Sequence, residues 1–124
     1  MAKTIDLTTQ VNQLLKEYGD EVNKVVDEVL PQVAKETVEM LKATSPRRTG
    51  KYARSWLIQN WKNSQHYTGV TIHNSRGELT HLLEFGHAKQ NGGRVQAEPH
   101  IDPANEFAQN KLVNLVSTKI RGIQ

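Results

Sequence analysis

Apolar residues recur at steps of three and four along the first third of the chain. The positions run through Leu7, Val11, Leu14, Tyr18, Val22, Val25, Val29 and Val33. Their mean spacing of about 3.7 residues is typical of an amphipathic α-helix rather than of a strict heptad coil. The pattern predicts one long helix over residues 7–43, with Asp6 as its N-cap. Because Pro31 lacks a backbone donor, we expect a kink or break near Val29–Leu30.

The pattern then changes from helical to alternating. Residues 44–54 contain a proline and a glycine and are interpreted as a connector. Alternating apolar and polar residues over Ser55–Trp61 and again over Tyr67–Asn74 predict two strands. Val70 and Ile72 are expected to point inward from the second strand. A short polar turn separates the two segments, so we expect them to pair as an antiparallel hairpin.

A short helix and a long loop follow the predicted hairpin. The helix is expected over Glu78–Phe85, and Gly86 is expected to end it in the left-handed αL conformation. The residues expected to face the core are Leu79, Leu82, Leu83 and Phe85. The loop over Gly86–Glu98 holds a glycine pair, and Arg94–Ala97 within it is a candidate strand.

The last element is a helix with a strong start signal. Asp102 is the expected N-cap and Pro103 occupies the expected first helical position. The sequence therefore predicts a single α+β domain over residues 1–124, with a small antiparallel sheet packed by a long N-terminal helix and a C-terminal helix and with a short helix between strands. The expected divisions are the long helix 1–43, the basic connector 44–54, the strands, short helix and loop of 55–101, and the C-terminal helix 102–121.

Charge is distributed unevenly along the chain. Residues 1–43 carry five lysines and eight acidic residues, a net charge of −3, whereas residues 44–124 carry a net charge of +6. This asymmetry suits head-to-tail contacts between copies of the chain or contact with a polyanion.

Composition excludes several classes of protein. The absence of cysteine excludes disulfides, thiolate metal sites and cysteine nucleophiles. No apolar run is long enough to cross a membrane, and the N-terminus lacks the apolar segment of a signal peptide. We therefore expect no membrane partner and a protein made and kept in a cytoplasm.

Candidate chemistry is sparse. His81 and Glu84 are three residues apart on the predicted short helix, and with His87 they are a candidate metal or acid–base cluster. Surface histidines beside an apolar stripe are the favoured interpretation, because a metal site needs more convergent ligands. The sequence contains neither a nucleophile elbow nor a phosphate-binding loop, so we expect no enzyme and no cofactor.

The basic segment within the connector is the better candidate for a site. Its cations surround one tyrosine and include no acidic neighbour; they are Arg47, Arg48, Lys51 and Arg54. Such a cluster can follow a phosphate backbone with salt-dependent affinity, as in a small nucleic-acid-binding module. A solvated loop, or a strip that meets the acidic helix of a neighbouring copy, explains the same residues.

Three short sequence motifs, in the same order along the chain, resemble those of one family of proteins. Ser45-Pro46, Thr49-Gly50-Lys51 and Arg54-Ser55-Trp56 resemble the segment that joins that family's first helix to its first strand. Leu82-Leu83-Glu84-Phe85-Gly86 resembles its "-E-x-G-" turn. Pro99-His100-Ile101-Asp102-Pro103-Ala104 resembles the start of its last helix. Over about 35–120 the chain thus resembles the tail-component proteins of long-tailed bacteriophages and prophages, also called tail-completion or head–tail joining (neck) proteins.

The resemblance implies a structural protein of the virion rather than an enzyme. Such proteins form rings, usually of six copies, between the head connector or stopper protein and the tail tube or tail-terminator protein, with DNA passing through the bore. A tail-terminator-like ring protein is the alternative within the same class. The loop is where this chain departs most from the pattern, and we expect contact with a neighbouring subunit or partner at His87, Lys89, Gln90, Asn91, Gly92, Gly93 and Arg94. In the ring, the basic segment is expected to line the bore or to bind the next subunit.

Overall fold

Helices dominate the structure, a computed structural model that describes residues 4–46, 50–63 and 65–123. Its elements in chain order are β1 (Ile5–Asp6), α1 (Thr8–Tyr18), α2 (Val22–Thr44), β2 (Trp56–Lys62), β3 (Tyr67–Asn74), α3 (Gly77–Phe85), β4 (His87–Ala88), β5 (Arg94–Val95) and α4 (Ile101–Ile123). The sheets are antiparallel and small. The predicted α+β fold class is therefore confirmed.

The predicted long N-terminal helix is in fact two helices. α1 and α2 are separated at Gly19–Glu21, where Gly19 adopts a φ of +78° that L side chains rarely take. α2 continues through Pro31, so the expected break near Val29–Leu30 was wrong. The side chains of Val29–Leu30 and Val33 are fully buried on either side of the proline. This packing holds the helix together despite the missing backbone donor.

The start of α1 also differs from the prediction by one residue. Leu7 is the cap position, and Asp6 lies in β1. The Asp6 carboxylate still accepts a hydrogen bond from the Thr8 backbone N–H at 2.9 Å. A methyl group at Gly69 would lie 2.9 Å from the Thr8 Cα, so the missing side chain there allows α1 to start directly against β3.

β3 is the central strand of the main sheet. The strand order is β1-β3-β2, and the predicted hairpin of β2 and β3 is confirmed with Ile58 opposite Ile72 and Asn60 opposite Val70. Val70 and Ile72 are fully buried, as predicted. β2 lies at the outer edge, where Leu57, Ile58 and Trp61 are exposed.

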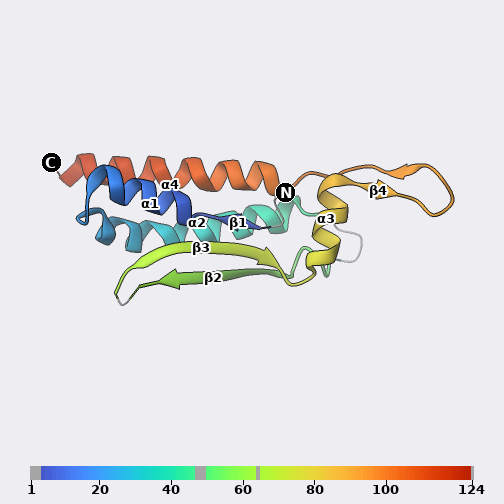
Figure 1. Cartoon of the computed structure of the whole chain (residues 1–124), viewed down its shortest axis with the longest axis horizontal. Coiled ribbons are helices and arrows are strands. Elements are labelled where there is room, and N and C mark those ends of the chain that lie inside the picture. The colour runs from blue at the N-terminus through green and yellow to red at the C-terminus, as the bar shows by residue number, and fades with distance from the viewer. Residues whose placement is uncertain (1–3, 47–49, 64, 124) are drawn as a thin grey trace.

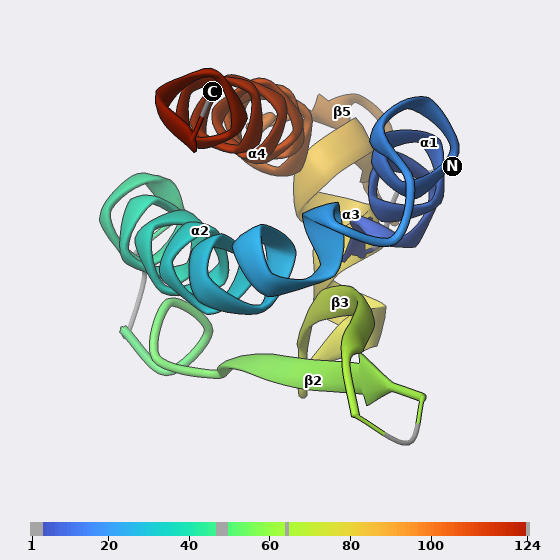
Figure 2. The ribbon, with the colours of Figure 1, turned by 90° about the vertical axis from the view of Figure 1, so that its left-hand side faces the viewer.

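Three helices pack together over one side of the hairpin. Figures 1 and 2 show α1, α2 and α4 side by side, with α4 running antiparallel to α2. α4 begins at Ile101, one residue before the predicted N-cap Asp102. Its buried face is Ile101, Ala104, Ala108, Leu112 and Val116. Over the described residues, no helix has both the length and the apolar character that crossing a bilayer requires.

α3 lies at one end of the elongated molecule, beyond the three packed helices (Figure 1). Its polar Thr80 and Glu84 are buried, whereas Leu79 and Leu82 are exposed by more than a third. The prediction that these leucines face the core was therefore wrong; Leu83 is partly buried against it. The buried face of α3 contacts polar groups at the ends of other elements. Hydroxyl and carboxylate side chains form hydrogen bonds with such groups, whereas leucine cannot.

Candidate assembly surface

Residues 87–95 form a hairpin that projects from the end of the molecule, and we call it the hairpin arm (Figure 1). β4 and β5 pair antiparallel, and the Lys89 N–H donates to the Gly93 carbonyl at 3.1 Å. The candidate strand proposed within Arg94–Ala97 is therefore present, although only Arg94–Val95 pairs. The structure brings the predicted contact residues together on this arm: His87, Lys89, Gln90, Asn91, Gly92, Gly93 and Arg94. Their role in contacting a partner stays a prediction.

Gly86 fixes the root of the hairpin arm. Its φ is +73° and its ψ is 177°, a positive-φ conformation that glycine alone adopts readily and that differs from the predicted αL conformation. A methyl group on Gly86 would lie 2.6 Å from the Val95 carbonyl oxygen. The Arg94 guanidinium also donates to the Phe85 carbonyl at 2.9 Å. Both the backbone conformation and the close approach of the returning strand therefore require glycine.

The buried carboxylate of Glu84 caps the start of α4. It accepts backbone hydrogen bonds from His100 at 2.8 Å, Ile101 at 2.9 Å and Asp102 at 3.2 Å. The first N–H groups of a helix have no partner within the helix, and its N-terminus favours a negative charge. Glu84 thus supplies the cap that the sequence assigned to Asp102, and it joins α3 to α4.

A buried hydrogen-bonded network extends from this cap to the connector. The His100 Nδ1 atom lies 2.8 Å from the Glu98 carbonyl and 3.1 Å from Glu84, and its Nε2 atom lies 2.7 Å from the Tyr52 hydroxyl. That hydroxyl is also 3.3 Å from the Thr80 hydroxyl. Burial raises the pKa of Tyr52; the Thr80 hydrogen bond opposes this shift and the charge on Glu84 adds to it. Tyr52 therefore stays a neutral phenol.

Two further hydrogen bonds anchor the connector. The Trp56 indole N–H donates to the Ser45 hydroxyl at 2.9 Å, and the Asn74 amide donates to the Tyr52 carbonyl at 2.9 Å. Tyr52, Trp56 and His100 also meet edge to face. The ends of α2, β3, α3 and α4 are thus joined around one aromatic cluster, which positions the arm.

The candidate metal or acid–base cluster is not assembled. Glu84 is engaged by the backbone of α4, and the Nδ1 atoms of His81 and His87 have no hydrogen-bond partner among the described residues. No group of three histidine or acidic side chains within the described residues could hold a metal ion. The network around His100 is a structural brace, because its groups satisfy one another and the helix cap.

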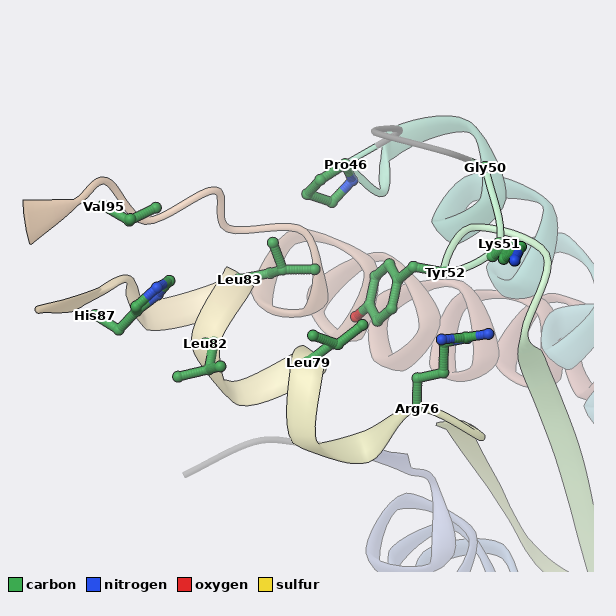
Figure 3. Close-up of a pocket in the computed structure, with 10 residues that line it drawn as sticks. All are labelled: Pro46, Gly50, Lys51, Tyr52, Arg76, Leu79, Leu82, Leu83, His87 and Val95. Carbon is green, nitrogen blue, oxygen red and sulfur yellow. The ribbon is translucent and has the colours of Figure 1, made fainter. Parts of the chain in front are cut away.

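A mostly apolar groove of about 480 Å³ lies between α3, the connector and the root of the hairpin arm (Figure 3). Its apolar lining comes from Pro46, Tyr52, Leu79, Leu82, Leu83 and Val95. Lys51 and Arg76 lie at one end of the groove and His87 at the other. The exposed leucines of α3 therefore belong to one concave surface. A concave apolar surface with a few polar groups is typical of a binding site.

Two of the four cations of the predicted basic segment lie within the described residues. Lys51 and Arg54 are exposed, and Lys51 lines the groove. Arg47 and Arg48 lie outside the described residues. The DNA-facing or intersubunit role of the four cations stays a prediction.

Comparison with known proteins identifies the family. The model of the family described as "Bacteriophage HK97-gp10, putative tail-component" matches residues 9–86, well over half of the chain. The chain belongs to this phage tail-component family. No curated protein and no solved structure matches the chain. The match starts earlier and ends earlier than the resemblance seen over about 35–120, so the hairpin arm and α4 of this tail component lie beyond it.

The network that braces this tail component is not evident from the sequence. Tyr52, Thr80 and His100 were not grouped, because they come from three separate segments. One signal was available: Glu84 and Thr80 are four residues apart among leucines, and an acidic residue within an apolar stripe often has a specific buried partner.

Proposed function

We propose that this tail component is a head–tail joining, or tail-completion, protein whose copies form a ring, usually of six, during virion assembly. Membership of the phage tail-component family supports a structural role in the virion. The projecting hairpin arm is the observation that carries the more specific proposal (Figure 1). The ring sits at the junction of head and tail, with the head connector or stopper protein on one side and the tail tube or tail-terminator protein on the other.

The hairpin arm has the properties of a docking element. Its tip, Lys89–Gly93, is exposed, and both glycines adopt left-handed φ angles of +86° and +79°. Its root is braced by Gly86 and Arg94, so a partner meets a largely preformed surface.

Deletion of Gln90–Arg94 tests this role. We expect the variant to remain folded, because the core lies in the three packed helices and β3, but to yield separate heads and tails. The variant is supplied in trans to a phage that lacks its own copy, and particles are counted by electron microscopy. Circular dichroism checks the fold of the purified variant.

Asn110→Ala is the matched control, because Asn110 is exposed on α4 away from the arm. It should support normal numbers of joined virions. Joined, infectious virions from the deletion variant would mean that the hairpin arm does not dock the tail to the head.

Contact with DNA is the second candidate role, and it is favoured by the exposed cations of the connector. Lys51 and Arg54 are exposed and belong to residues 44–124, which carry a net charge of +6. In a ring, these side chains would contact DNA phosphates in the bore without reading sequence.

A further inference from the structure

The groove beside α3 selects for an apolar side chain that is accompanied by negative charge. Its lining is mostly apolar, and the cationic side chains of Lys51 and Arg76 lie together at one end of the groove. An occupant that buries an apolar group and brings carboxylates to the rim would satisfy both features.

The chain itself carries such a segment at the turn between α1 and α2. Tyr18 is exposed by 36%, and Glu17, Asp20 and Glu21 beside it are exposed as well. The other large apolar side chains exposed away from the groove have no acidic residue adjacent to them in sequence; within the described residues these are Leu57, Ile58, Trp61 and Val113. We call residues 17–21 the acidic turn.

The groove and the acidic turn lie at opposite ends of the elongated molecule. Figure 1 shows the turn between α1 and α2 at one end and α3 with the hairpin arm at the other, and Figure 2 views the molecule from the end that bears the turn. The turn of a chain therefore cannot reach its own groove. A contact between two different surfaces of identical subunits repeats from copy to copy and closes into a ring when the rotation between copies allows.

We infer that the acidic turn of one copy docks in the groove of the next copy, with Tyr18 against the apolar lining and the carboxylates facing Arg76. The inference rests on the proposed ring and names the contact that builds it. It also assigns the exposed leucines of α3 to an interface, which explains why they do not face the core.

Paired cysteines test this contact, because the natural chain contains none. The variant Asp20→Cys/Leu82→Cys carries one thiol on the turn and one in the groove. Under mild oxidation it should give a ladder of disulfide-linked dimers, trimers and larger species, on the order of tenfold faster than a control pair. The control is Asp20→Cys/Asn110→Cys, whose second thiol lies on the exposed face of α4.

The oxidation is run both on purified protein and on particles isolated from infected cells, so that a ring formed only on the head connector is also sampled. Equal cross-linking of the two pairs, or none in either sample, would overturn the inference. Joined virions without cross-linking of the turn–groove pair would leave the head–tail joining role standing and remove only this contact.

Charge reversal gives an independent measurement on the same variant. Arg76→Glu should lower the cross-linked yield by about tenfold, since it places like charges face to face. Adding Glu21→Arg to that chain should restore the yield, because every repeated contact then pairs opposite charges again. A yield that does not respond to Arg76→Glu would contradict the charge pairing on which the choice of occupant depends.

Discussion

Glu84 illustrates how one side chain can decide the arrangement of whole elements. Glu84 is 2% exposed, and its carboxylate accepts three backbone hydrogen bonds, one from His100 and two from the first residues of α4. Hydrogen bonds to a charged acceptor in a buried site are among the stronger ones in proteins. In the sequence, the same residue was a candidate member of a metal or acid–base cluster with His81 and His87, although surface histidines were the favoured interpretation. Its surroundings show instead that it holds α3 against the start of α4.

Replacing Glu84 with glutamine should therefore destabilise the protein strongly. The amide offers one acceptor oxygen and turns an NH₂ group toward backbone donors, so we expect a loss of about 2–4 kcal/mol in the free energy of unfolding. Urea denaturation followed by circular dichroism measures this loss.

Glu78→Gln is the matched control, because Glu78 is exposed in the first turn of the same helix. It should change the free energy of unfolding by less than about 0.5 kcal/mol. Similar stability of the two variants would show that the cap on α4 contributes little.

At the scale of elements, the N-terminal helices show how tertiary packing overrides a local signal. Pro31 predicted a kink or break in the helix, yet α2 continues through it between buried residues. The break occurs instead at Gly19–Glu21, where a glycine is followed by two acidic residues, a local signal for the end of a helix. The position of that break creates the acidic turn at the end of the molecule.

Pro31→Ala should stabilise the protein. Alanine supplies the backbone N–H that proline lacks and removes a clash with the preceding turn, so we expect a gain of about 2 kcal/mol, observed as a higher melting temperature. Gln32→Ala, at the next exposed position, is the control and should change stability by less than about 0.5 kcal/mol. A lower melting temperature for Pro31→Ala would indicate that a proline-induced bend is needed for packing against α4.

At the scale of the whole molecule, residues 1–43 and residues 44–124 differ in net charge. The acidic part contains α1 and most of α2, and the basic part supplies the hairpin of β2 and β3, the groove, the hairpin arm and α4. This separation is what the proposed contact between copies and the proposed contact with DNA both require.

Contact with DNA, the second candidate role, can be measured separately from the contact between copies. Arg47→Ala/Arg48→Ala/Arg54→Ala removes three cations of the basic segment but keeps Lys51, which lines the groove. We expect weak binding of double-stranded DNA by the natural protein, and a salt dependence shallower by about one unit of slope for each arginine that contacts a phosphate. Fluorescence anisotropy over a salt series measures both. The absence of binding at low salt would exclude the DNA contact.

The sequence by itself determined the fold class, the paired strands, the start of α4 to within one residue and membership of the tail-component family, because these depend on local periodicity and on short ordered motifs. The tertiary structure alone decided which face of α3 is buried, that α2 continues through Pro31 and what Glu84 does. Each of these depends on a partner distant in the chain, such as His100 for Glu84. Periodicity cannot show that a buried face meets polar helix ends rather than an apolar core, and so it placed Leu79 and Leu82 inside when they line an open groove.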